Sequence, residues 1–502
     1  MPALVLAHDL GTSGNKASLY DEYGRLVASF TSPYATHYFH GNWAEQDPDD
    51  WWLAVCRSTR EVLAHVEAAD VVAIGFSGHM TGCLPIDRDG RVLRPHILWA
   101  DQRAGEQKRW IDERIDAKTL FHLTGHRSSE TTTLAKIRWI MDKEPAVARR
   151  TAAYLNAKDY LVYRLTGVVC TDPSDASATT LFDIRTRTWS EDLLERFGVP
   201  ADKMPGVRPS ASVVGHLLKE AALDLGLPSG VPVVTGGGDG PAANLGAGCI
   251  APGRVHVCIG TSGWLMESTD APKNEVQDGT FNFCHVIENM YSPTGTMQSA
   301  GSSYAWLSGL LGVRKADRDA LEADMRLSGP GANGVLFLPY LMGERAPYWN
   351  PKAKGAFLGL KQETTAADMT RAVLEGVALH LNVIRRRLDP DGLVKQISAV
   401  GGGARSDLWC QILADVLQTD IRRLCRLEEA GGLGAAVLAG VGVGLYPDYS
   451  VIDAFQSVER VFVPSAEKAR FYQNRTDMQE HVYLTTKDIM ATLADEDTAW
   501  HG

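Results

Sequence analysis

The sequence is poor in cysteine, and its cysteines show none of the spacings that cysteine chemistry requires. The eight of them are scattered without a C-x-x-C pair, at Cys56, Cys83, Cys170, Cys249, Cys258, Cys284, Cys410 and Cys425. The spacing therefore suggests neither a disulfide framework nor a zinc site. No P-loop motif (G-x-x-x-x-G-K followed by Ser or Thr) occurs either, which excludes the P-loop enzymes.

Long apolar runs are also absent. The longest weakly polar run, Gly431 to Tyr446, is shorter than the roughly 18 residues that a membrane span requires, and its Gly, Ala and Val content predicts a tightly packed helix. Near the N-terminus, the apolar stretch Ala3 to Ala7 meets His8 and Asp9 before it could form the core of a signal peptide. We therefore expect a cytoplasmic protein with no membrane partner.

Positive charge is in deficit. The 502 residues include 50 Lys and Arg against 61 Asp and Glu, so the formal net charge is −11. Such an acidic chain does not hold a nucleic-acid backbone or an anionic membrane surface by bulk electrostatic attraction. We expect no nucleic-acid partner, and local groups must hold any anionic substrate.

The sequence does contain a regular alternation of strand-like runs and helical periodicities, which is typical of α/β architecture. Leu4 to Ala7 and Val71 to Phe76 have the pattern of buried strands. A helix is predicted after Asp47, with a proline at its first position and acids in its first turn. Thr365, with Asp368 three residues later, predicts the capped start of another helix.

A repeated tetrapeptide suggests that the chain consists of two related halves. Gly11-Thr12-Ser13-Gly14 follows one apolar strand, and Gly260-Thr261-Ser262-Gly263 follows another, Val255 to Ile259, about half the chain later. The position of both copies at a strand end gives the repeat its weight. Ala251-Pro252-Gly253 interrupts the pattern between them. We expect domains at 1–248 and 253–502, with a cleft between them.

The first tetrapeptide can form part of a phosphate site. Asp9 ends the preceding strand, and Lys16 follows the turn that contains Thr12 and Ser13. Such a turn can aim backbone N–H groups at a phosphate, with hydroxyls and an ammonium group completing the site. A plain β-hairpin would use the same glycines. The presence of one copy in each half favours a nucleotide held between the halves.

Two further glycine runs follow predicted strands, at Gly236 to Gly240 and at Gly401 to Ala404. Glycine there lets a ligand approach the main chain closely. Asp239 is the single acid within the first run. It is either a turn residue, because Asp-Gly is common in turns, or a base that takes a proton from a substrate hydroxyl during attack on a γ-phosphoryl group.

Two segments can line a substrate pocket, Ser77 to Gly82 and Leu98 to Arg103. An aromatic face beside carboxylate, amide and guanidinium groups suits a polyol. The alternative is structural, with Trp99 and Met80 in the core and Asp101 paired with Arg103 on the surface. The two interpretations stay open at this point.

Several longer motifs point to one family. They are Gly355-Ala356-Phe357-Leu358-Gly359-Leu360 with Asp368, Met369 and Ala372 to Glu375; Tyr340 to Pro347; Gly401 to Ser406; and Thr133, Lys136, Ile137, Trp139 and Asp142, beside which Thr131 and Lys143 depart from the pattern. With these motifs the chain resembles the FGGY carbohydrate kinases of the actin-like ATPase superfamily, and among them the xylulokinases, over nearly its whole length.

The resemblance implies an α/β fold of two actin-like (ribonuclease H-like) domains, with ATP and sugar bound between them. It makes Asp239 the general base, and it makes Asp9 and Asp239 the carboxylates that place Mg²⁺. The ATP-binding residues it implies are Thr12, Ser13, Lys16, Gly260, Thr261, Gly402, Gly403 and Ser406. The sugar-binding residues it implies are His79, Met80, Thr81, Trp99, Asp101 and Asp239.

The activity that the resemblance implies is transfer of the γ-phosphoryl group of ATP to a primary hydroxyl of a ketopentose, with D-xylulose first, by a homodimer. Two positions depart from the xylulokinase pattern. Xylulokinases typically read Gly-Gln-Met-His-Gly where this chain has Gly78-His79-Met80-Thr81-Gly82, and Ala100 replaces an asparagine. Threonine carries no charge near neutral pH, so hydrogen bonding to the sugar changes, although the neighbouring His79 could compensate.

These departures leave two alternatives. The first is a kinase of the same family that acts on another ketose or on a polyol. The second, from a different functional class, is a non-catalytic ATP-binding protein of the same superfamily, which the presence of Asp239 disfavours.

Overall fold

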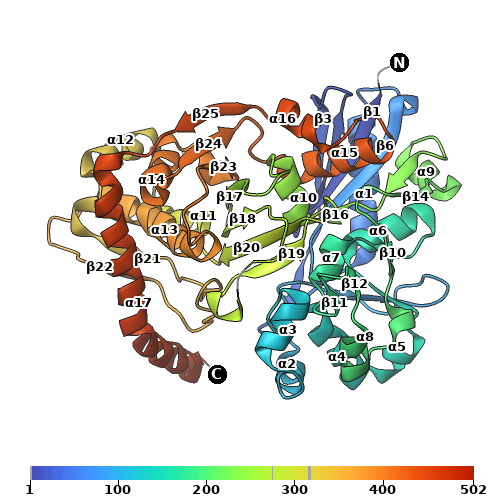
Figure 1. Cartoon of the computed structure of the whole chain (residues 1–502), viewed down its shortest axis with the longest axis horizontal. Helices are drawn as coiled ribbons and strands as arrows, with labels where there is room; N and C mark the ends of the chain where they lie inside the picture. The colour runs from blue at the N-terminus through green and yellow to red at the C-terminus, as the bar shows by residue number, and fades with distance from the viewer. Residues whose placement is uncertain (1–2, 274, 315–317, 502) are drawn as a thin grey trace.

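Two seven-stranded sheets form the centre of the protein (Figure 1). The computed structural model describes residues 3–273, 275–314 and 318–501. In spatial order the first sheet contains β14 (Val213–His216), β15 (Pro232–Val234), β6 (Val71–Gly78), β1 (Leu4–Leu10), β2 (Gly14–Tyr20) and β3 (Leu26–Pro33), with β16 (Gly237–Gly238) beside β6. The second contains β19 (Phe281–Cys284), β20 (Tyr291–Met297), β18 (Gly263–Glu267), β17 (Val255–Ile259), β23 (Gln396–Val400), β24 (Asp420–Leu424) and β25 (Val458–Phe462).

The two sheets share one strand arrangement. In the first, β1 pairs antiparallel with β2, which pairs antiparallel with β3, while β6 and β15 follow in parallel on the other side of β1. In the second, β17 takes the place of β1, with β18 and β20 antiparallel on one side and β23 and β24 parallel on the other. This common topology explains why the same tetrapeptide turn occurs once in each half.

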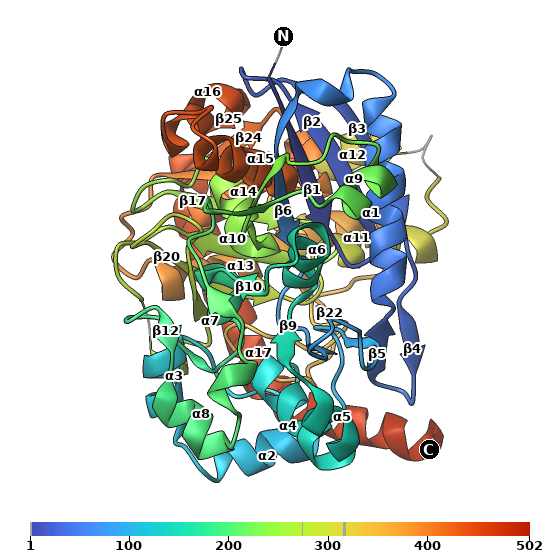
Figure 2. The ribbon, with the colours of Figure 1, turned by 90° about the vertical axis from the view of Figure 1, so that its right-hand side faces the viewer.

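Both faces of the first sheet are buried. Along β1, Leu4 and Leu6 belong to the core beneath α1 (Pro48–Leu63), whereas Val5 and Ala7 belong to the core beneath α15 (Ala430–Gly442). Figure 2 shows the two helices on opposite sides of these strands. A strand covered on both faces carries apolar side chains at successive positions, as the sequence predicts.

Each half of the chain contributes a helix that contacts the sheet of the other half. α15 comes from the second half of the chain but packs on the first sheet, and α10 (Asp239–Gly246) comes from the first half and bonds to the second, since His256 Nδ1 of β17 lies 2.7 Å from Asn244 Oδ1. Where α10 and α15 pack together, a Cβ on Gly246 would overlap the Ala430 carbonyl, and one on Gly434 would overlap the Ala242 carbonyl. Glycine is required at both positions because the two backbones touch.

The helices predicted from capping signals form where expected. The Asp47 side chain caps α1, accepting from Asp49 N at 2.9 Å, and Thr365 and Asp368 form the capping box of α13 (Ala366–Leu388). α15 is the packed helix predicted in the Gly-, Ala- and Val-rich run. α13 and α14 (Asp407–Leu417) provide the main core of the second sheet. No helix among the described residues combines the length and apolar character needed to cross a membrane.

Smaller elements surround the two sheets (Figure 1). The short strands are β4 (His37–Phe39), β5 (Trp43–Gln46), β7 (Leu84–Ile86), β8 (His96–Ile97), β9 (Ala153–Leu155), β10 (Cys170–Thr171), β11 (Phe182–Asp183), β12 (Thr188–Trp189), β13 (Gly206–Val207), β21 (Leu336–Leu338) and β22 (Ala356–Leu358). The other α-helices are α2 (Gly105–Asp112), α3 (Ala117–Thr124), α4 (Thr133–Lys143), α5 (Pro145–Arg150), α6 (Ala157–Thr166), α7 (Pro173–Ser177), α8 (Glu191–Phe197), α9 (Lys219–Leu225), α11 (Gly301–Leu310), α12 (Arg318–Ser328), α16 (Ile452–Phe455) and α17 (Ala466–His501).

Candidate functional site

Three neighbouring strands of the first sheet end with the residues that the sequence singles out. β6 is the shared neighbour, and its Ser77 lies opposite Asp9 of β1 on one side and Gly237 of β16 on the other. Asp239 then begins α10, immediately after β16. The parallel register therefore brings Asp9, a predicted metal ligand, and Asp239, the predicted base, to one edge of the sheet.

The electrostatics of the two acids reflect this proximity. Asp239 is open to solvent, yet desolvation by the surrounding protein and the negative charge of Asp9 raise its pKa to about 7. Burial also raises the pKa of Asp9, which is partly covered by the first residues of α15. Two carboxylates that repel each other in this way form a favourable place for a cation.

The donor set fits Mg²⁺. The described part of the chain contains no group of three or more His, Cys, Asp and Glu side chains that could hold a metal ion. Mg²⁺ does not need such a group, because it keeps several waters and is usually held by one or two carboxylates together with the substrate phosphates. Asp9 and Asp239 place two carboxylates, which are hard oxygen donors, at one sheet edge.

The turn between β1 and β2 joins the predicted ATP and sugar residues. Thr12 Oγ1 accepts a hydrogen bond from Trp99 Nε1 at 2.9 Å, and Ser13 at the tip of the turn is exposed. Lys16 is already engaged, since its ammonium group forms an ion pair with Glu429 and donates to the Glu428 carbonyl at 3.3 Å. A contact between Lys16 and a phosphate would have to share or replace the Glu429 pair.

The equivalent turn in the second sheet lies at the start of α11. The Gly260 carbonyl accepts from Gly301 N at 2.8 Å, and the Thr261 carbonyl accepts from Ala300 N at 3.0 Å. The Thr261 side chain is exposed. The turn is thus fixed through its carbonyls, while its hydroxyl stays free to contact a ligand.

The glycine run after β23 lies directly beside this turn. A Cβ on Gly401 would stand 2.7 Å from the Ile259 carbonyl, and one on Gly403 would overlap the Ile259 side chain. Gly402 is exposed, and Ser406 caps α14 by accepting from Trp409 N at 3.2 Å. The predicted ATP residues of the second half therefore gather at one end of the second sheet.

On the predicted sugar side, Met80 and Thr81 follow β6. Met80 is 6% exposed and packs against Phe281 of the second half, and a Cβ on Gly238 would overlap it. Thr81 has a left-handed backbone with φ of 59°, which is rare for a β-branched residue and stores strain. The loop that carries the main departure from the xylulokinase pattern is thus held in a fixed, unusual shape.

His79 does not take the place of the missing pocket histidine in this structure. It is 1% exposed and lies behind the loop, with its ring centroid 5.5 Å from Trp51 and 5.4 Å from His96. Burial lowers its pKa to about 3, so the ring is neutral. Both ring nitrogens are covered by protein, and this geometry does not support direct contact with a sugar.

Asp101 is also placed differently from either sequence interpretation. Its carboxylate pairs with Arg103 at 2.7 Å and accepts from Ala44 N at 2.6 Å, and the side chains of Asp101 and Arg103 are fully buried. The pair is therefore a core feature, neither on the surface nor open to a ligand. Trp99 lies at the predicted site, with the guanidinium carbon of Arg345 5.6 Å from its ring centroid.

Lys136, to which the sequence assigned no role, bonds to the loop that carries Thr81. It is fully buried, and its ammonium group donates to the Thr81 carbonyl at 2.7 Å and to the Thr131 carbonyl at 2.6 Å. Burial lowers its pKa to about 7. A lysine on an otherwise apolar helix face could have indicated a buried ammonium group. The sequence could not have identified its carbonyl partners, because the tertiary fold sets them.

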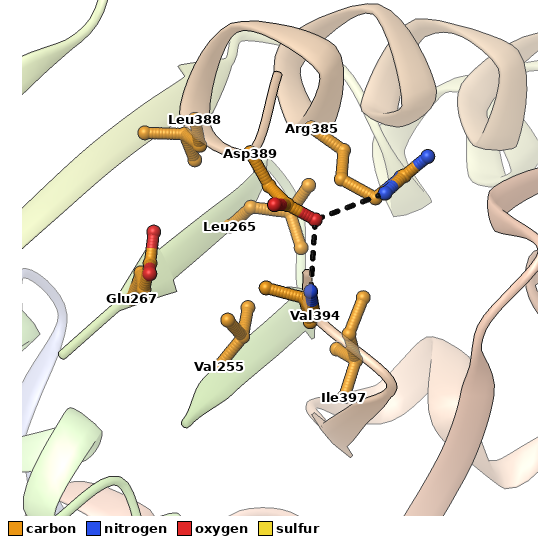
Figure 3. A pocket seen from close by; sticks show the side chains of 8 residues that line it. All are labelled: Val255, Leu265, Glu267, Arg385, Leu388, Asp389, Val394 and Ile397. Carbon is orange, nitrogen blue, oxygen red and sulfur yellow. Dashed lines mark hydrogen bonds and ion pairs between the residues drawn. The ribbon is translucent and has the colours of Figure 1, made fainter. Parts of the chain in front are cut away.

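The pocket shown in Figure 3 lies away from this site. It is lined by Val255, Leu265, Glu267, Arg385, Leu388, Asp389, Val394 and Ile397. β17 runs from Val255 in this pocket to Ile259 beside the Gly260 turn, so the pocket lies at the opposite end of the strand. Its wall is mostly aliphatic, and Asp389 is already bonded to Arg385 and to Val394 N. We assign it no role in substrate binding.

The chain is similar to known sugar kinases along almost its whole length. The xylulose kinase of Escherichia coli (strain K12) is 34% identical over 491 residues, which are 97% of this chain and 100% of the relative. The gluconokinase of Bacillus licheniformis is 30% identical over 485 residues, which are 94% of each protein. The structure of a ligand-bound xylulose kinase from Lactobacillus acidophilus superposes with a TM-score of 0.91 at 26% identity, covering 97% of this chain and 98% of the other.

Two family descriptions match successive parts of the chain. Residues 4–246 match the N-terminal domain of the FGGY family of carbohydrate kinases, and residues 255–443 match the C-terminal domain of that family. The first sheet and the two aspartates lie within the first segment, and the second sheet lies within the second segment except for β25. The chain therefore belongs to the FGGY family of carbohydrate kinases.

Proposed function

We propose that this sugar kinase phosphorylates a primary hydroxyl of D-xylulose and that Asp239 is its general base. The observation that supports this proposal is the meeting of Asp9 and Asp239 at one sheet edge, beside Met80 and the Thr12 turn. Asp239 would accept the hydroxyl proton while the sugar oxygen forms a bond to the γ-phosphorus. The bond from that phosphorus to the bridging oxygen then breaks, and ADP leaves.

Asp9 and Asp239 would also hold Mg²⁺, which neutralises phosphate charge when ATP is bound. The turns that contain Thr12 and Thr261 would contact the phosphates, and Gly402 and Gly403 would lie against the adenosine. Lys16 would join the phosphates if its pair with Glu429 opens. Catalysis in this arrangement is mainly positioning and charge stabilisation.

The sugar assignment draws on relatives at 31 to 34% identity that are named for xylulose, with a gluconokinase at 30%. Thr81 and Ala100 make the assignment worth testing directly. A suitable panel contains D-xylulose, L-xylulose, D-ribulose, L-ribulose, glycerol, erythritol and D-gluconate, with ADP formation from Mg-ATP as the readout. We expect the highest kcat/KM for D-xylulose. Preference for another sugar would reject D-xylulose and keep the kinase, and ATP turnover that ignores every sugar would reject the proposed acceptor class.

The division of labour between the halves is part of the same proposal. The segment 1–248 would carry the base and the sugar pocket, and 253–502 would carry the adenosine site. A homodimer is the proposed assembly. Sedimentation of the purified protein at several concentrations tests it, and a monomer at all of them would contradict it.

The pKa of Asp239 makes the rate depend on pH near neutrality. The proton acceptor must be ionised, and desolvation by the surrounding protein together with the charge of Asp9 raises the pKa of the Asp239 carboxyl group to about 7. Below that pH the carboxyl group is protonated and cannot accept the sugar proton. We expect kcat/KM for the sugar to fall as the pH drops through about 7 and to level off above it. A steady-state pH profile measures this, and a constant rate across the neutral range would contradict it.

A further inference from the structure

A buried ion cluster lies directly behind the loop that carries Asp239. The ammonium group of Lys158 stands 2.7 Å from an oxygen of Asp159, 3.3 Å from one of Asp172 and 3.3 Å from one of Asp175. All four side chains are at most 2% exposed. The proposed mechanism does not use any of these residues.

The cluster is costly to bury. Burial alone would lower the pKa of Lys158, but the three carboxylates together raise it well above its ordinary value, so the lysine keeps its charge. Burial raises the pKa values of Asp159 and Asp175. Buried ion pairs contribute little net stability, so a network of this kind suggests a role in fixing a particular geometry.

One hydroxyl links the cluster to the catalytic loop. Ser174 Oγ lies 2.6 Å from Asp172 Oδ2 and accepts from Gly238 N at 2.9 Å. The Ser174 hydroxyl has a single proton and donates it to Asp172 Oδ2, so its oxygen accepts the bond from Gly238 N. This fixes a lone pair of Ser174 toward Gly238, the residue before Asp239.

The glycines of the loop let it lie against the cluster. A Cβ on Gly78 would stand 2.9 Å from Lys158 Cβ, and one on Gly236 would stand 3.2 Å from Lys158 Cδ. One on Gly237 would stand 3.4 Å from Ser174 Oγ. The backbone from Gly236 to Gly238 therefore has little freedom to move toward the cluster.

We propose that Ser174 is a positioning residue, which Asp172 orients and Lys158 supports, and which fixes Gly238 so that the Asp239 carboxylate points at the sugar hydroxyl. Ser174 does not touch substrate in this proposal and acts only through the backbone. The inference rests on the proposed role of Asp239 as the base.

Ser177 provides a matched control on the same short helix, α7. It is fully buried like Ser174, and its hydroxyl also accepts one backbone N–H, from Cys284 of β19 at 3.0 Å, while donating to the Ser174 carbonyl at 2.7 Å. Each serine-to-alanine change therefore removes one buried acceptor. Only the change at Ser174 frees the loop that carries Asp239.

The test compares Ser174→Ala with Ser177→Ala in steady-state kinetics and thermal unfolding. The Ser174→Ala change should lower kcat by about 10- to 100-fold, because displacement of a reacting group by about 1 Å can lower the rate by about that factor. KM for ATP and sugar should change less than about twofold, since Ser174 contacts neither. Ser177→Ala should keep kcat within about twofold at a similar loss of thermal stability.

Equal kcat losses in the two variants, or a change confined to KM, would overturn the proposal. If Ser174→Ala does not fold, Ser174→Cys carries the test, because sulfur is a weak acceptor of similar size and should give an intermediate kcat. A kcat equal to that of the unmodified protein would then count against positioning. Asp239→Asn is measured in parallel: normal turnover in that variant would reject the base assignment itself, whatever Ser174 does.

Discussion

Asp239→Asn is expected to lower the turnover of sugar phosphorylation by about 10²- to 10⁴-fold, the range that a positioned general base contributes. The amide has nearly the same shape as the carboxyl group but cannot accept the sugar proton. ATP should still bind, because the turns at Thr12 and Thr261 and the glycines after β23 are unchanged. ADP formation measures the first effect, and calorimetric titration with a non-hydrolysable ATP analogue measures the second.

The strength of this test lies in the position of the residue. Asp239 begins α10, and its carboxylate accepts from Gly240 N at 2.8 Å, an interaction that the amide oxygen of asparagine preserves. The variant should therefore fold normally, and its pH profile should lose the inflection near neutrality. Turnover within about tenfold of the unmodified enzyme would show that the acid is a turn residue rather than a base.

Asp9→Asn is expected to lower kcat about a hundredfold or more and to move the Mg²⁺ requirement to higher concentration. Metal ions contribute several kcal/mol of charge stabilisation to phosphoryl transfer. Removing one of two candidate carboxylate ligands weakens both the hold on the ion and the charge compensation at the phosphates. The measurement is a titration of initial rate against free Mg²⁺ at saturating ATP and sugar.

A carboxylate on the same hairpin provides the control. Asp21 follows β2, bonds to Arg25 at 2.8 Å and lies at the other end of the strand from the Thr12 turn. Asp21→Asn should leave the Mg²⁺ titration unchanged. A titration for Asp9→Asn that matches this control would show that Asp9 is not a metal ligand.

The sequence predicted the strands, the turns and the glycine runs well because their signals are local. The turns at Gly11 to Gly14 and Gly260 to Gly263 form from their own residues and do not depend on distant contacts. The capping residues Asp47 and Thr365 likewise start their helices through local hydrogen bonds. The family resemblance implied that Asp9 and Asp239 act at one site, and the structure supplies the reason, since β1, β6 and β16 are parallel and end at a common sheet edge.

The features that sequence reasoning missed depend on distant partners. The sequence left Asp101 either as a sugar-binding residue or as the surface partner of Arg103, because nothing local shows that both side chains are buried in the core. The sequence likewise suggested that His79 could contact a ligand, whereas in the structure the rings of Trp51 and His96 pack against it. Lys136 was identified only as a motif match, since its bond to the Thr81 carbonyl joins residues that are 55 positions apart in the sequence. The periodicity of a sequence indicates that a residue is buried, but it does not identify the residues that pack against it.

The exchange of helices between the halves bears on how the chain folds during its synthesis. When the ribosome has completed the strands of the first sheet, the helix that covers Val5, Ala7 and Val234 has not yet been made, because α15 lies near the end of the chain. One apolar face of the nascent sheet is therefore exposed to solvent until α15 is made, and such a state is prone to aggregation. We expect the first sheet to complete its folding only after α15 has been made, with chaperones that protect this face raising the yield of active enzyme.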